Sequence, residues 1–165
     1  IASTFEGLMI LDENEKAIYG VAKDMQISED QLTYTFTLRD DAKWSDGQKV
    51  TANDFKFSWL RALNPETAAE YAYQLFYIKN GQAYNSGEAT AEEVGIEVVD
   101  ESTLKVTLEA PTVYFAELMA FPTYMPLRED IVTANPEGWA NNPETYMSNG
   151  PFKLVEWTMK DRFVV

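Results

Sequence analysis

The sequence predicts an α+β fold in which a mixed or antiparallel sheet is flanked by helices. Residues 33–38 alternate polar and apolar side chains with period two, which is typical of a strand with one buried face. Residues 95–100 and 103–109 alternate in the same way around a polar turn, and this predicts a hairpin. A helical pattern at 52–63 lies between these strands, without the regular βαβ succession of a parallel sheet.

The first elements predicted along the chain are strands. Residues 5–11 are mostly apolar and precede a polar turn at 12–15, so we expect a short buried strand that leads into an exposed loop. In the alternating strand described above, Tyr34, Phe36 and Leu38 share one face. We expect this face to point into the core and the threonine face to meet solvent.

The helix over 52–63 has the clearest start signal in the chain. Residues 45–47 read Ser-Asp-Gly and supply the chemistry of a turn. Thr51 and Asp54 then resemble a capping box in which aspartate takes the place of glutamate. The acidic side chain also suits the positive end of the helix dipole.

Apolar side chains cover more of this helix than a one-sided surface helix needs. Phe55, Trp59 and Leu63 form one stripe, and Phe57 and Leu60 widen it. We therefore expect the helix to be buried on more than one side.

The rest of the chain predicts shorter elements. These are a second helix at 66–77 that carries several tyrosines, the hairpin with Leu104, Val106 and Leu108 pointing inward, a short helix at 113–120, a helical turn at 129–133 and a strand at 152–157. Gly150 is expected to serve the turn before the last strand.

The composition favours one globular domain over residues 1–165. The chain is 45% apolar and 13% aromatic, which is enough to build a core. Its formal charge is −14 at pH 7, whereas nucleic acids and anionic membranes bind basic surfaces. We therefore expect neither as a partner. No cysteine is present, so there is no disulfide framework.

Both ends of the sequence look cut. The first predicted strand has almost no leader before it, and the chain stops at 162–165 within what reads as another strand. No apolar run approaches the roughly 18 residues of a membrane span, and no signal segment opens the chain. We expect a fragment of a longer protein.

The residue types exclude several classes of chemistry. Without histidine or cysteine, the chain lacks a Ser-His-Asp triad, a Cys-His pair and the usual zinc ligands. Asp40-Asp41 and Glu92-Glu93 leave a paired-carboxylate mechanism open, although they read as solvated surface pairs. Residues 12–15 lack the glycine and distal glutamate of an EF-hand loop, and no phosphate-binding glycine motif occurs. These patterns predict neither a metal site nor a bound cofactor.

Four segments in a fixed order resemble one protein family. They are FEGLMI at 5–10, TYTFTLRDDAKWSDGQKVTANDFKFSW at 33–59, LEAPTVYF at 108–115 and SNGPFKLVEW at 148–157. In order and spacing the chain resembles the peptide-binding proteins of bacterial ABC importers, the extracellular solute-binding protein family 5. The resemblance covers essentially the whole chain.

The resemblance implies a receptor that captures oligopeptides for a membrane permease, has no catalytic activity and acts as a monomer. It implies a two-lobe fold of the periplasmic-binding-protein type II class, with this chain as part of the first lobe. Most of the chain, about 10–150, would then be the extra subdomain of that lobe, with main-lobe strands at both ends. The family's lipoprotein cysteine and first mature strand are missing from this sequence. The implied location is a periplasm or the outer face of the cell membrane, with a lipid anchor.

Two aromatic residues match family positions near the peptide cavity. These are Tyr71, in the segment after the capped helix, and Phe121. Receptors of this kind are similar in binding the ligand backbone by hydrogen bonds and leaving its side chains in roomy, hydrated pockets. The resemblance thus predicts Tyr71 and Phe121 as ligand-binding residues, whereas Trp44 and Trp59 are expected to pack in the core.

Three alternatives stay open on the sequence. A receptor of the same architecture would bind another solute, such as a nickel complex, an oligosaccharide or an opine. A carboxylate-pair glycosidase would need two carboxyl groups that face each other across a cleft. A purely structural interaction domain is the third.

Overall fold

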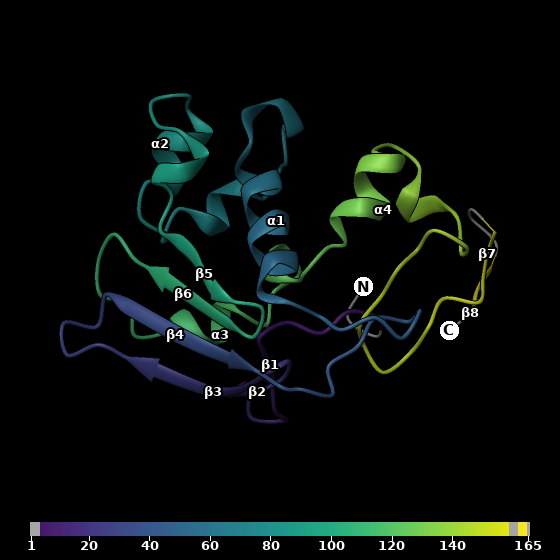
Figure 1. Ribbon diagram of the computed structural model, residues 1–165, viewed down its shortest axis with the longest axis horizontal. Coiled ribbons are helices and arrows are strands. Elements are labelled where there is room, and N and C mark those ends of the chain that lie inside the picture. Colours follow the sequence, from purple (N-terminus) through teal and green to yellow (C-terminus); the bar gives the residue numbers. More distant parts are fainter. Residues whose placement is uncertain (1–3, 159–161, 165) are drawn as a thin grey trace.

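A four-stranded antiparallel sheet in the order β3-β4-β6-β5 lies on the opposite side of the molecule from β7 and β8 (Figure 1). The computed structural model describes residues 4–158 and 162–164. Its strands are β1 (Met9–Leu11), β2 (Ala17–Tyr19), β3 (Ala22–Ile27), β4 (Thr33–Leu38), β5 (Ile96–Asp100), β6 (Thr103–Thr107), β7 (Glu156–Thr158) and β8 (Arg162–Val164). Its α-helices are α1 (Ala52–Leu63), α2 (Gly81–Asn85), α3 (Phe115–Leu118) and α4 (Glu129–Ala134). Short 3₁₀ helices are η1 (Pro65–Thr67), η2 (Ala72–Leu75), η3 (Ala91–Glu93), η4 (Pro122–Tyr124) and η5 (Trp139–Asn141). The predicted α+β class is confirmed.

The inner strands β4 and β6 supply the core of the sheet. Phe36 lies opposite Leu104 in the register, and both side chains are fully buried. The two faces that the alternation predicted are confirmed, because their six apolar side chains are all buried: Tyr34, Phe36, Leu38, Leu104, Val106 and Leu108. The hairpin between β5 and β6 is confirmed as well.

Helix α1 stands over the sheet and contacts β5 (Figure 1). It begins and ends at the predicted residues. The Asp54 carboxylate accepts hydrogen bonds from the backbone N–H of Thr51 at 2.8 Å and from the indole N–H of Trp44 at 3.1 Å. The cap of the helix is therefore tied to a buried ring of the preceding turn.

Trp59 is the central packing residue of α1. Its side chain is fully buried, and its indole N–H donates to the backbone carbonyl of Tyr124 at 2.8 Å. The rings of Phe55 and Tyr124 meet it edge-on, with centroids at 6.1 and 5.3 Å. Both tryptophans expected in the core, Trp44 and Trp59, are buried there.

The outer side of α1 differs from the prediction. Phe57 and Leu60 are only half-buried. Both line an open groove, and of the two only Leu60 is also packed against the core. The expected burial of the helix on more than one side is thus wrong for this face.

The prediction of a helix at 66–77 is wrong. Two separate 3₁₀ helices, η1 and η2, take its place. Ala68 lies between them in a left-handed conformation with φ of 49°, which an α-helix does not accommodate. The break leaves Tyr71 just before η2 and points neighbouring tyrosines to the surface.

Three other predicted elements are shorter in the structure. The first strand begins only at Met9, and its other residues, Ile10 and Leu11, are exposed, so it is not a buried strand. The helix predicted at 113–120 is the single turn of α3. The last predicted strand begins at Glu156, because the preceding residues from 152 to 155 have no strand pairing. The helical turn predicted at 129–133 is confirmed as α4.

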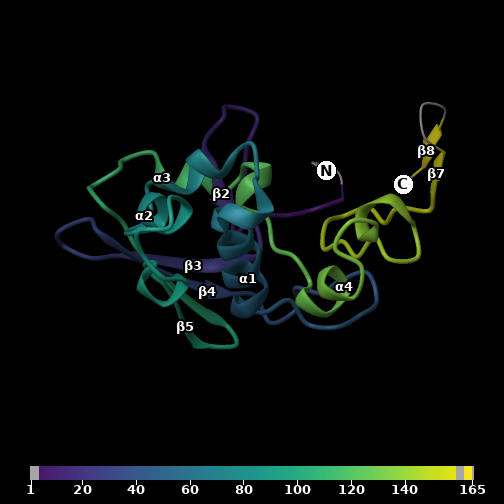
Figure 2. The same ribbon diagram turned by 90° about the horizontal axis from the view of Figure 1, so that it is seen from above.

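The segments around residues 4–6 and 146–150 are joined side by side (Figure 2). The Gly150 N–H donates to the Thr4 carbonyl at 2.8 Å, and the hydroxyls of Thr4 and Tyr146 lie 2.9 Å apart. The Asn149 side chain accepts from the Glu6 N–H at 3.1 Å and donates to the Glu6 carbonyl at 2.9 Å. A Cβ on Gly150 would lie 2.6 Å from the Thr4 carbonyl carbon. Glycine therefore serves this close approach, and not a turn with positive φ.

Arg128 ties the start of α4 to the turn before α1. Its side chain is 8% exposed and donates to Asp46 at 3.0 Å and to Asp130 at 2.6 and 2.8 Å. The bonds from Arg128 hold the pKa of Asp130 below its usual value. For Asp46, burial acts in the opposite direction, but bonds from the Gln48 N–H and from Arg128 leave its pKa lowered too.

Replacing Arg128 with methionine is expected to lower the free energy of unfolding at neutral pH by about 2 kcal/mol, between the values of exposed and buried ion pairs. The pKa of each carboxyl is lower in the folded than in the unfolded protein. Their stabilisation is therefore complete above the unfolded pKa and is lost as the pH falls through the folded pKa. Urea denaturation at a series of pH values should show the gap between wild type and Arg128→Met closing on acidification. A gap independent of pH would contradict this account.

Candidate functional site

Tyr71 lies at the start of η2 and is 54% exposed. Its ring is tilted against that of Tyr73, with centroids 6.2 Å apart. Tyr73 is exposed as well. The Tyr71 ring is therefore accessible, and it stands before a 3₁₀ helix instead of on the expected α-helix.

Phe121 lies directly before η4 and is 42% exposed, so it is not an ordinary core phenylalanine. The two 3₁₀ helices η2 and η4 are in contact. Gln74 of η2 is bonded to the Thr123 hydroxyl, and its backbone carbonyl accepts from the Tyr124 hydroxyl at 2.5 Å. These bonds bring the segments of both predicted residues together.

A hollow of about 260 Å³ lies where these two segments meet α1. We call it the Tyr71 hollow; it is lined by Ser58, Arg61, Ala62, Ala69, Glu70, Tyr71, Pro122, Thr123 and Leu127. Phe121 is not part of this lining, although the next two residues are. The structure thus places Tyr71 in a hollow and Phe121 beside it. The lining mixes one aromatic ring, apolar walls, two aliphatic hydroxyls and two charged groups.

A second hollow of about 260 Å³ shares Ser58, Pro122 and Leu127 with the first. Its further lining is aromatic and aliphatic: Phe5, Met125, Pro126, Trp139, Ala140 and Tyr146. The Ser58 hydroxyl is already satisfied by the Met125 carbonyl at 2.7 Å. This hollow therefore suits an apolar group and offers little hydrogen bonding.

A pair of tyrosines that sequence reasoning missed lies beyond η2. The hydroxyls of Tyr77 and Tyr114 are 3.3 Å apart, and their rings meet edge-on at 5.7 Å. The bond from Tyr114 raises the pKa of Tyr77. The density of tyrosines at 66–77 was a visible signal, but the partner comes from a segment distant in sequence.

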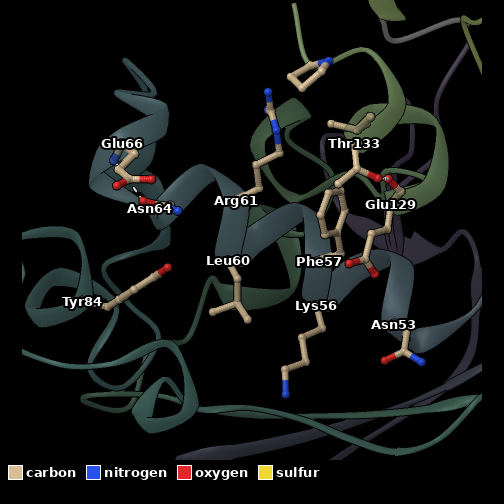
Figure 3. Close-up of a pocket in the computed structure, with 12 residues that line it drawn as sticks. Asn53, Lys56, Phe57, Leu60, Arg61, Asn64, Glu66, Tyr84, Glu129 and Thr133 are labelled. Atoms are coloured by element: carbon tan, nitrogen blue, oxygen red, sulfur yellow. Dashed lines mark hydrogen bonds between the residues drawn. The ribbon is translucent and has the colours of Figure 1, made fainter.

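A groove of about 690 Å³ runs along the outer side of α1 (Figure 3). Its apolar lining includes Phe57, Leu60 and Val132, which explains why the first two are half-buried. Its polar lining comes from α1, η1, α2 and α4: Asn53, Lys56, Arg61, Asn64, Glu66, Tyr84, Glu129 and Thr133. The groove is bounded by Pro136.

The two carboxylate pairs that are adjacent in sequence, Asp40-Asp41 and Glu92-Glu93, lie on the surface. Asp40 pairs with Lys23 at 3.0 Å, and Asp41 lies 3.7 Å from Arg39. Glu92 and Glu93 are exposed at η3. Within the described residues, 4–158 and 162–164, no group of three or more aspartates or glutamates is arranged to hold a metal ion.

Hollows of this kind, with apolar walls and a few polar groups beside an exposed aromatic ring, are typical of surfaces that bind small ligands. Residues 16–165 match the model of the bacterial extracellular solute-binding proteins, family 5 (middle region). The chain belongs to this family, and its description places the family outside the cell.

The relatives share both sequence and fold. The oligopeptide-binding protein OppA of Bacillus subtilis is 46% identical over 157 residues, which are 95% of this chain and 29% of OppA. The structure of Listeria monocytogenes OppA bound to peptide matches with a TM-score of 0.92 and 46% identity, over 95% of this chain and 31% of that one. The substrate-binding domain of an oligopeptide ABC transporter from Bacillus anthracis matches with a TM-score of 0.96 and 46% identity, over 98% and 31%.

The chain therefore spans about three-tenths of the length of these relatives. In the part of the chain that the structure describes, no helix is long and apolar enough to cross a membrane.

Proposed function

We propose that this chain is part of the substrate-binding receptor of an ABC importer and helps to capture oligopeptides for delivery to the permease. The observation that carries the proposal is the 46% identity to OppA over nearly the whole chain. The receptor acts by binding and release, as a monomer without catalysis, outside the cytoplasmic membrane and either free in a periplasm or anchored by lipid.

Within that receptor, residues 1–165 form a single domain that belongs to the first lobe. The region of about 10–150 is mostly the extra subdomain, with main-lobe strands at both ends. The joint between residues 4–6 and 146–150 supports this division, because it brings the two ends of the region together.

Tyr71 and Phe121 are the proposed ligand-binding residues. Tyr71 offers an exposed ring on the wall of a hollow, and Phe121 offers a second exposed ring beside it. Aromatic faces bury much area against a peptide at a low cost in side-chain entropy. A peptide backbone can pack on them whatever its side chains, which suits a receptor of broad specificity.

The test is an amide-resolved NMR titration of the labelled chain with a pool of three- to five-residue peptides. Peptide binding should shift signals around Tyr71 and Phe121, and Tyr71→Ala should weaken it about tenfold, as for a binding hot spot. Tyr19→Ala is the matched control, because Tyr19 is similarly exposed, at 48%, but lies on β2. Absence of shifts, or equal effects of both variants, would overturn the site assignment for this chain.

A further inference from the structure

Arg61 lies on α1 between the groove and the Tyr71 hollow. It lines both the groove and the Tyr71 hollow, and it is the one residue that their linings share among the described residues. Figure 3 shows its side chain pointing to the opposite side of α1 from that of Lys56. Lys56 lines the groove but not the Tyr71 hollow. Of these two cations of α1, only Arg61 is therefore placed to reach a ligand at Tyr71.

The guanidinium of Arg61 is not engaged by the fold. Within residues 4–158 and 162–164 it makes neither a salt bridge nor a side-chain hydrogen bond, whereas Arg39 and Arg128 are both paired with carboxylates. An arginine carries five N–H donors in a planar fork that matches a carboxylate. Arg61 thus retains its full capacity to bind one.

Two acidic residues lie near Arg61 without neutralising it. Glu66 lines the groove and Glu70 lines the Tyr71 hollow, but neither forms a salt bridge with Arg61. Both are exposed, so solvent screens their charges. In a chain of net charge −14, an unpaired cation on the wall of a hollow is a local site of attraction for an anion.

We infer that Arg61 is a specificity-determining residue of the Tyr71 hollow and binds a carboxylate of the captured peptide. The inference rests on the proposed function. A bidentate pair of arginine and carboxylate adds geometric selectivity to the packing of a peptide against the Tyr71 ring. The favoured ligands are therefore short peptides that present a carboxylate, from the C-terminus or from an acidic side chain, beside the group that packs on Tyr71.

The test compares three peptides by NMR titration of the chain: trialanine, trialanine amide and Ala-Glu-Ala amide. Wild type should bind trialanine about tenfold more tightly than its amide, as expected for one charge-assisted pair. Arg61→Gln should lose this preference and bind both peptides equally. If Ala-Glu-Ala amide regains the affinity of trialanine, a side-chain carboxylate serves as well; if it does not, the terminal carboxylate is the group recognised.

Lys56→Gln is the matched control and should keep the full preference, because it removes a cation from the same helix but not from the hollow. Equal affinity of wild type for trialanine and its amide would overturn the role of Arg61 and leave peptide capture intact. Absence of shifts at Tyr71 with any of the peptides would instead overturn the assignment of Tyr71 as a ligand-binding residue of this chain, and the inference with it. The comparison of acid with amide uses wild-type protein, so a folding defect in Arg61→Gln does not obscure the result.

Discussion

Replacing Trp59 with alanine is expected to lower the free energy of unfolding by about 3–5 kcal/mol, the range for truncation of a buried large aromatic side chain. Three losses combine at this position. The ring is fully buried, its contacts with Phe55 and Tyr124 disappear, and the Tyr124 carbonyl loses the indole N–H. An unpaired buried carbonyl adds its own penalty. Since small domains are stable by only about 5–15 kcal/mol, the variant should be close to unfolding.

Urea denaturation followed by circular dichroism measures this effect without depending on the fluorescence of the lost ring. Phe57→Ala on the same helix is the control, because Phe57 is half-buried in the groove. It should lower the free energy of unfolding by only about 1 kcal/mol. If the two variants were equally destabilised, the packing of α1 would not be centred on Trp59.

The second large effect is expected at Gly7. A Cβ added there would lie 2.2 Å from the Met119 carbonyl oxygen and 3.1 Å from that of Met9. Both atoms belong to the backbone and cannot rotate away, so α3 and β1 would have to separate. Gly7→Ala should therefore lower the free energy of unfolding by about 3 kcal/mol, at the upper end of the overpacking range.

A matched control separates this clash from the usual effect of losing a glycine. Gly87 has positive φ of 80° but open space around it. Gly87→Ala should therefore show only the strain of a left-handed backbone, about 1 kcal/mol. Thermal or urea unfolding of both variants provides the comparison. A Gly7→Ala protein as stable as Gly87→Ala would mean that the β1 and α3 backbones can move apart freely.

The elements predicted well from sequence are those with a complete local signal. Helix α1 has a turn, a cap and an apolar stripe, and β4 has a strict alternation with period two. Strand β3 was missed because its pattern is weak. It is held by pairing with β4, where Met25 lies opposite Phe36, and a bulge after Ala22 interrupts its register. Because β3 depends on this pairing with its partner strand, its own sequence shows no clear alternation of polar and apolar residues.

The helix predicted at 66–77 failed for a different reason. A single left-handed residue, Ala68, divides the segment, and alanine is the strongest helix former in local propensity. Contacts with η4, through the bonds of Gln74 to Thr123 and Tyr124, favour the irregular path instead. Tertiary structure here overrides the propensity of the segment.

The candidate site was only partly predictable for the same reason. Tyr71 and Phe121 were named from a resemblance, and their exposure agrees with an accessible role. Their closeness depends on contacts between segments about fifty residues apart, as between Gln74 and Tyr124. Arg61 gave no signal at all, because an arginine on a helix is usually solvated. Only its place between two cavities sets it apart.

The joint between residues 4–6 and 146–150 also has a mechanical consequence. Tension applied to the chain on either side of it would be carried first by the bonds of Thr4 to Tyr146 and Gly150 and of Glu6 to Asn149. The same place also holds the turn before α1, because the Ser45 N–H donates to the Ser148 carbonyl at 2.7 Å and the Phe5 ring meets that of Trp44 edge-on. A pull on either end would therefore reach the body of the molecule through this one cluster of contacts.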